Sequence, residues 1–197
     1  GGLISSVVHS DSNNVFNINC DIEKFAYNYA KGDPIDEYRT VSEISQWSIS
    51  GTEIIKLHPD FPNLICEIET FRGCPRQEHC SFCSEGLYEN IEFRDEENII
   101  QEINKLIKNG ISRFRLGRQA DILQYKTEFS EFKNGFPRPL VSPISSLFNE
   151  LKKLKENGKI KILNIDNANP GTIANFPEES SKIIESKNWS STLFIQP

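Results

Sequence analysis

Three of the chain's five cysteines fall within ten consecutive positions. They are Cys74, Cys80 and Cys83, in the stretch "FRGCPRQEHCSFC". Thiolates bind zinc and iron–sulfur clusters, and a Cys-x-x-Cys pair also occurs in redox enzymes. A structural zinc site uses four protein ligands, usually as two separated pairs, whereas this loop has one pair and one further cysteine. A thioredoxin-like motif would leave Cys74 unexplained.

A four-iron cluster is commonly held by four thiolates, so three thiolates would leave one iron without a protein ligand. This open iron is comparable to the open coordination position of a catalytic zinc ion, which is filled by water or substrate. The loop therefore predicts a cluster that binds and activates a small molecule. We expect Cys20 and Cys66 to be small buried apolar residues. We do not expect His58 or His79 to be metal ligands.

From residue 62 onward the sequence alternates between strand and helix patterns. We expect strands at 63–70, 111–117, 159–166 and 191–196, helices at 95–110, 142–158 and 177–187, and a long loop at 118–141. This alternation predicts an α/β fold with a parallel sheet and right-handed crossovers, either open or closed as a barrel. In both cases the chemistry lies at the carboxyl ends of the strands. The cysteine loop, "GRQAD" and "DNANPGT" should therefore meet at one rim.

The charged residues of the first two strands alternate along the chain. Glu67 and Glu69 face one side of the first strand, and Arg113 and Arg115 have matching positions on the second. Unpaired buried charges are costly, so we expect the arginines to pair with the glutamates in a structural ion network.

The N-terminal region differs in character. Residues 1–40 contain a short apolar strand, "LISSVV", and a helical pattern at 21–33, as in the C-terminal remnant of a preceding α/β domain. Residues 41–61 have a mixed pattern with prolines, which predicts a linker. The chain contains no methionine and opens on "GGLISSVV", so we expect it to be an internal fragment of a longer protein.

The stretch "ETFRGCPRQEHCSFCSEGLY" resembles the signature loop of the radical S-adenosylmethionine (radical SAM) enzymes. The phrases "EIETFRGCPR", "CSFC" and "FRLGRQAD" are similar to archaeal-type members of that superfamily. The commonest spacing there is CxxxCxxC, and this chain has two extra residues between its first and second cysteines. The resemblance covers about residues 41–185.

The resemblance implies a chemistry for the cysteine loop. Cys74, Cys80 and Cys83 would ligate three irons of a 4Fe–4S cluster, and the fourth iron would chelate S-adenosylmethionine. An electron from the cluster would cleave the sulfonium to methionine and a 5′-deoxyadenosyl radical, which abstracts hydrogen from a substrate that the sequence does not identify. The cofactor supplies the difficult chemistry, and the protein positions it.

The resemblance also implies cofactor-binding residues. Phe82 occupies the place of an aromatic that packs near the adenine. Gly117, Arg118 and Gln119 lie where the second-strand loop contacts the amino end of S-adenosylmethionine, although a turn with a solvated arginine explains Arg118 equally well.

At the end of the third strand, Asp166 and Asn167 have side chains suited to ribose hydroxyls or to substrate. Asx turns before Pro170 explain the same composition without a ligand.

By the same resemblance, residues 62–197 would form the N-terminal part of a TIM-barrel-like radical SAM core, with four of about six strands. An electron donor such as a ferredoxin or flavodoxin would be needed. Cobalamin would suit a domain before the core, but no residue indicates it. The net charge of −6 argues against a broad nucleic-acid surface, and no apolar run approaches the roughly 18 residues of a membrane span.

We accordingly expect a cytoplasmic enzyme without a membrane partner. Two alternatives stay open from the residues. The chain is also compatible with a non-enzymatic zinc- or iron–sulfur-binding module, and with a protein that uses its cluster only for electron transfer.

Overall fold

The computed structural model describes residues 21–34, 39–88, 90–189 and 193–195, and the chain divides into two compact units, Gly1–Ile44 and Ser45–Pro197. The first unit contains helix α1 (Ile22–Lys31), which ends at Gly32 in a left-handed conformation with a φ of 76°. Glycine adopts this conformation without the steric cost that a Cβ brings. The helix confirms the pattern at 21–33, whereas the strand expected at "LISSVV" lies outside the described residues.

The segment expected as a linker contains two helices. These are α2 (Val41–Gly51) and the short 3₁₀ helix η2 (Ile54–Leu57). A capping box begins α2: the Glu43 N–H donates to Thr40 Oγ1 over 3.2 Å, and the Thr40 N–H donates to the Glu43 carboxylate over 2.8 Å. This Thr-x-x-Glu spacing is a helix-start signal, and the linker interpretation overlooked it.

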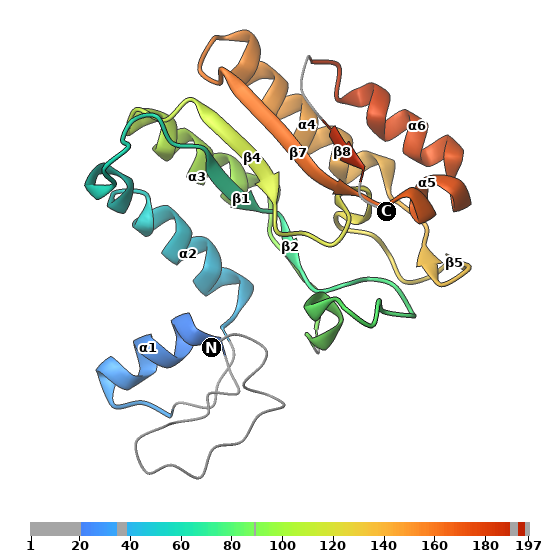
Figure 1. The fold of residues 1–197 in the computed structure, drawn as a ribbon, viewed down its shortest axis with the longest axis horizontal. Helices are drawn as coiled ribbons and strands as arrows, with labels where there is room; N and C mark the ends of the chain where they lie inside the picture. Colours follow the sequence, from blue (N-terminus) through green and yellow to red (C-terminus); the bar gives the residue numbers. More distant parts are fainter. Residues whose placement is uncertain (1–20, 35–38, 89, 190–192, 196–197) are drawn as a thin grey trace. The chain divides into compact units, whose positions relative to one another are not determined.

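The second unit is built on a parallel sheet (Figure 1). Strands β1 (Cys66–Glu69), β4 (Arg113–Gly117), β7 (Ile162–Ala168) and β8 (Leu193–Ile195) lie in the order β1-β4-β7-β8, and every pair is parallel. The mixed α/β class and all four expected strands are therefore confirmed. Over the described residues the strands form an open sheet and do not close into a barrel.

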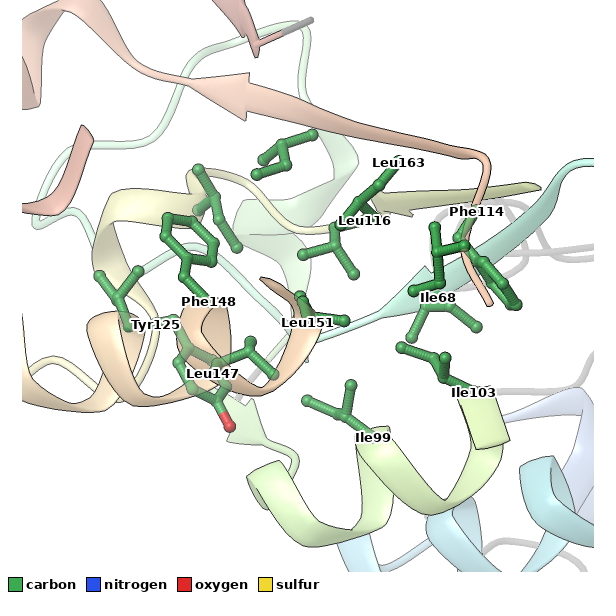
Figure 2. Packing of buried hydrophobic residues seen from close by; sticks show 14 of the residues in the cluster. Ile68, Ile99, Ile103, Phe114, Leu116, Tyr125, Leu147, Phe148, Leu151 and Leu163 are labelled. Carbon is green, nitrogen blue, oxygen red and sulfur yellow. The ribbon is translucent and has the colours of Figure 1, made fainter. Parts of the chain in front are cut away.

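Helices cover one face of this sheet. Helix α3 (Glu96–Lys108) follows the cysteine loop, α4 (Val141–Glu156) precedes β7, and α5 (Pro170–Asn175) and α6 (Pro177–Ser186) precede β8. Figure 2 shows the apolar face of the sheet against α3 and α4. The buried residues at this contact are Ile68, Phe114, Leu116 and Leu163 from the strands and Ile99, Ile103, Leu147 and Leu151 from the helices.

The alternation of side chains along each strand leaves polar groups on the opposite face. Glu67 and Arg115 are exposed there, and Asp166 near the end of β7 is buried. Parallel sheets usually have apolar residues on both faces, because both faces are normally covered. The second face of this sheet is therefore built for polar contacts.

Two small antiparallel pairs extend the unit beyond the sheet. Strand β2 (Phe71–Arg72) pairs with β3 (Glu92–Phe93), and β5 (Phe132–Lys133) pairs with β6 (Phe136–Pro137). The long loop expected at 118–141 thus contains the β5–β6 hairpin and the 3₁₀ helix η4 (Ile122–Gln124). Asn134 and Gly135 form the turn with φ values of 51° and 77°. Asn-Gly is the preferred sequence for such a turn, and the sequence interpretation missed this signal.

No helix within the described ranges is both long and apolar enough to cross a membrane.

Candidate functional site

The cysteine loop leaves the carboxyl end of β1 and is closed at its base. β2 and β3 bring the two ends of the loop together, with Phe71 opposite Phe93 in the ladder. The Gly73 N–H donates to the Glu85 carboxylate over 3.1 Å, and burial raises the pKa of this carboxyl. Gly73 has a φ of 93°, which favours glycine at the point where the chain turns into the loop. The loop is therefore anchored at its base and through the 3₁₀ helix η3 (Ser84–Leu87).

Cys74, Cys80 and Cys83 are free thiols, and all three are half-buried in this loop. The Cys83 N–H donates to the Cys80 carbonyl over 3.0 Å, which forms a tight turn between these two cysteines. Burial raises the pKa of the Cys74 thiol. A backbone hydrogen bond from Arg76 and its charge lower it, and the neighbouring Cys83 and Cys80 raise it again. Cys80 and Cys83 thus both lie within electrostatic reach of Cys74.

The described residues contain no group of three His, Cys, Asp or Glu side chains that is arranged to hold a metal ion. The structure therefore brings the three cysteines into one loop without forming a ligand shell. Cys66 is also a free thiol; it packs against the hydrophobic core as expected, but it is half-buried and not fully buried. Cys20 lies outside the described residues.

Phe82, between two of the cysteines, is 85% exposed. Single exposed apolar side chains are common on protein surfaces, so exposure alone assigns no ligand. Its ring is nevertheless available for contact on the outer side of the cysteine loop.

The second loop begins at Gly117, which pairs with Glu69 across the sheet. A Cβ at position 117 would collide with the Glu67 carboxylate, so the glycine allows this close approach. Arg118 follows with a φ of 61°, a left-handed conformation that is uncommon outside glycine. Its side chain is 59% exposed, and its Nε lies 3.7 Å from the Glu69 carboxylate. The backbone thus turns sharply and presents Arg118 at the rim.

Gln119 is buried and joins the three strand ends. Its Nε2 donates to the Asp166 carbonyl over 2.8 Å, and its Oε1 accepts from Thr70 Oγ1 over 3.3 Å. Asn167, with a φ of 60°, donates from Nδ2 to the Gln119 carbonyl over 2.8 Å. The side chain of Gln119 therefore points into the protein, where its hydrogen bonds hold the strand ends in place.

Asp166 is buried and forms an ion pair with Arg115. Arg115 Nε also lies 3.9 Å from a Glu67 oxygen, which confirms the expected pairing of these two residues. The carboxylates raise the pKa of Arg115, chiefly through the hydrogen bond to Asp166. One guanidinium thus lies between two carboxylates and links three strands.

The expected pairing of Arg113 with the glutamates is wrong. Glu69 pairs with Arg72 over 2.9 Å, and Arg113 donates to Asn63 over 3.3 Å. Arg72 belongs to β2, so the shorter ion pair of Glu69 is with the base of the cysteine loop.

Asp121, a buried residue at the same rim, was not predicted from the sequence. Its carboxylate accepts from Thr172 Oγ1 over 2.6 Å and from the backbone N–H groups of Asn169 and Leu123, each over 3.1 Å. Burial raises the pKa of Asp121 to about 7. An acidic residue directly before the apolar "ILQ" is a helix-cap signal that could have identified it.

Asn169 caps α5 through the Gly171 N–H over 2.8 Å. This confirms an Asx turn as the explanation for this residue of "DNANPGT".

No family model matches the chain. It is 42% identical over 165 residues to an uncharacterized protein of Methanocaldococcus jannaschii, a match that covers 82% of this chain and 28% of that protein. It is also 42% identical over 142 residues to an uncharacterized protein of Archaeoglobus fulgidus, covering 72% of this chain and 25% of that protein. A second uncharacterized M. jannaschii protein is 35% identical over 106 residues, or 51% of this chain and 21% of its own length. The chain thus spans between about a fifth and just over a quarter of the length of these archaeal relatives.

Proposed function

We propose that this chain is part of a radical SAM enzyme in which Cys74, Cys80 and Cys83 hold a 4Fe–4S cluster. The observation that carries the proposal is the set of three free thiols in one loop at the carboxyl end of β1. The carboxyl ends of β4 and β7 lie beside that loop in the same sheet. In α/β proteins this edge is where ligands bind.

The three cysteine thiols are suitable ligands for a 4Fe–4S cluster. Thiolates are the usual ligands of iron–sulfur clusters, and three of them leave one iron open to a small molecule. When bound, the cluster supplies the electron that cleaves S-adenosylmethionine reductively. The thiol side chains would have to move to ligate it, because the described residues hold no preformed metal site.

The remaining rim residues have distinct proposed tasks. The exposed Phe82 ring would pack on the adenine, and the exposed Arg118 guanidinium would hold the carboxylate of S-adenosylmethionine. The backbone at Gly117 would allow the cofactor to approach. Gln119 and Asn167 would act by positioning the three strand ends.

We further propose that the open sheet is the first part of a (β/α) barrel. In this arrangement the face with Glu67, Arg115 and Asp166 would be the barrel interior. In the strand register Arg113 lies opposite Ile162, and Arg115 lies opposite both Glu67 and Asn164. Layered inward-facing side chains are typical of such barrels.

The test uses single Cys→Ala variants at each of the five cysteines of residues 1–197, made in the full-length protein. Iron and sulfide are measured after anaerobic reconstitution. We expect Cys74→Ala, Cys80→Ala and Cys83→Ala each to lose the four-iron cluster. Cys20→Ala and Cys66→Ala should retain it and serve as matched controls.

Electron paramagnetic resonance of the reduced protein then tests the open iron. We expect the spectrum to change when S-adenosylmethionine is added. If Cys66→Ala loses the cluster as fully as Cys80→Ala, the site has four protein ligands, and simple electron transfer replaces the radical mechanism. If the loop Cys→Ala variants lose bound zinc instead of iron, the chain is a zinc-binding module.

A further inference from the structure

Arg76 lies in the cysteine loop between the first two thiols and contacts both. Its Nη1 donates to Cys80 Sγ over 3.2 Å. Its backbone also forms a hydrogen bond with the Cys74 thiol. One residue therefore supplies hydrogen-bond donors to two of the three sulfur atoms.

The β5–β6 hairpin holds Arg76 from the other side. The guanidinium carbon lies 4.4 Å from the centroid of the Phe136 ring, within the range of a cation–π contact. The next residue along the loop, Gln77, donates its N–H to the Gly135 carbonyl over 2.9 Å. The hairpin thus fixes both the side chain of Arg76 and the backbone beside it.

Phe136 is itself fixed by α5. A Cβ at Gly171 would collide with the Phe136 ring, so the glycine allows the ring to lie against α5. Helix α5 follows β7 directly, and Asn169 caps it. A chain of contacts therefore runs from the end of β7 through Phe136 and Arg76 to the sulfur of Cys80.

The environment of the guanidinium strengthens these interactions. Its Nε is buried without a hydrogen-bond partner, and its charge also lowers the pKa of the buried Asp121. A cation that is partly removed from water acts more strongly on neighbouring charges than a solvated one.

We propose that Arg76 positions the sulfur of Cys80 and raises the reduction potential of the cluster. The proposal rests on the function proposed above. Reduction adds a negative charge, and a cation that donates a hydrogen bond to a ligand sulfur stabilises the reduced state. Arginine suits this place because its planar group can stack on Phe136 while it donates to sulfur, which a lysine ammonium cannot reproduce.

The first test is a redox titration of the reconstituted full-length protein, followed by electron paramagnetic resonance. We expect Arg76→Met to shift the cluster to a more negative potential and Arg76→Lys to shift it less. Arg138→Met is the matched control, because Arg138 also lies over a phenylalanine, Phe176 at 5.3 Å, but belongs to a different ion-pair group with Glu131. Equal potentials for Arg76→Met and the unaltered protein, at equal iron content, would overturn the proposal.

The second test needs no iron. In the metal-free protein we expect Arg76→Met to speed hydrogen exchange at the Gln77 amide. Gly171→Ala should do the same by displacing Phe136, with Arg76 itself unchanged. Gly51→Ala is the control, since a Cβ there meets no atom within 4 Å.

The two tests separate the two proposals. If the unaltered protein takes up no iron, the proposed function fails, and amide exchange still decides whether Arg76 positions the loop. Unchanged exchange in both Arg76→Met and Gly171→Ala would refute that role. If only Arg76→Met fails to fold, the redox titration and the amide exchange are measured on Arg76→Lys, and the amide exchange also on Gly171→Ala.

Discussion

At the scale of single residues, Asp121 shows how the rim is held together. Its carboxyl group is buried and accepts hydrogen bonds from the loop after β4 and from the start of α5. Burial disfavours the charged form more strongly than these donors favour it, so the pKa rises from 3.8 to about 7. The protonation of one carboxyl group therefore affects both loops near neutral pH.

This residue should give the protein a specific dependence of stability on pH. Between pH 4 and 7 the folded state holds the Asp121 proton and the unfolded state does not, so this group lowers stability as the pH rises. Asp121→Asn imitates the protonated form and removes the effect. We expect the variant to gain stability relative to the unaltered protein over this range, by at most about 1.4 kcal/mol per pH unit.

Urea denaturation of the full-length protein at pH 5, 6, 7 and 8 measures this difference. Above about pH 7 the difference should become constant, because the group is then ionised in both states. A difference that does not change between pH 5 and 7 would show that Asp121 is already ionised in the folded protein.

Phe82 carries the second prediction at this scale. We expect Phe82→Ala to weaken S-adenosylmethionine binding by about 1 kcal/mol, or roughly fivefold, because it removes an aromatic contact. Cluster content should stay unchanged, since the ring ligates no metal. Calorimetry on the reconstituted protein measures S-adenosylmethionine binding. The control variant is Phe129→Ala, which removes a 50% exposed ring outside the cysteine loop. Loss of iron from Phe82→Ala would assign the ring a structural role.

At the scale of elements, Arg94 connects the base of the cysteine loop to two helices. It follows β3, is 2% exposed, and donates from Nη1 to the Glu69 carbonyl over 2.9 Å. Its Nη2 lies 2.8 Å from Glu102 of α3 and donates to Ser48 of α2 over 3.0 Å. The end of β1 is thus tied to α2 and α3 by one side chain, directly before the cysteines begin.

We expect Arg94→Met to destabilise the fold by about 3–5 kcal/mol, because it leaves Glu102 buried without its ion-pair partner. The double variant Arg94→Met/Glu102→Leu should recover a large part of that loss, since apolar packing replaces both charges. Urea denaturation of the full-length protein measures the effect. The control Arg138→Met removes a partly exposed arginine and should cost about 1 kcal/mol or less. Similar losses for the two arginines would contradict this assignment.

At the scale of the whole molecule, the sheet has two unlike faces and two edges. One face is packed by α3 and α4, and the other carries exposed charges and the exposed side chains of Ile65 and Ile162. Over the described residues, β1 forms one edge of the sheet and β8 the other. The archaeal relatives are more than three times as long as the matched region.

We expect residues 1–197 alone to self-associate, because an unpaired strand edge is a template for pairing with another chain. Size-exclusion chromatography with light scattering measures the mass, with the full-length protein as the control. A fragment that stays monomeric and unfolds cooperatively would show that the edge and the polar face need no further cover.

The sequence by itself determined the order of the main elements and the cysteine loop. Helix α3 has acids in its first turn, lysines in its last and a buried isoleucine stripe, and these local features fix a helix wherever it packs. The four strands and their parallel arrangement follow from the same alternation of patterns. The capping box of α2 and the Asn-Gly turn of the hairpin were also present in the sequence, and only the interpretation omitted them.

Only the tertiary structure decided the partners of the side chains. Glu69 pairs with Arg72 instead of Arg113, and Gln119 is directed into the protein instead of outward. Arg76 meets Phe136, a residue sixty positions later in the chain, only because the hairpin folds back onto the cysteine loop. Residue type and local spacing describe what each side chain can do. Contacts between distant segments depend on how the crossovers and loops bring strand ends together. Local sequence patterns do not specify which distant segments will meet.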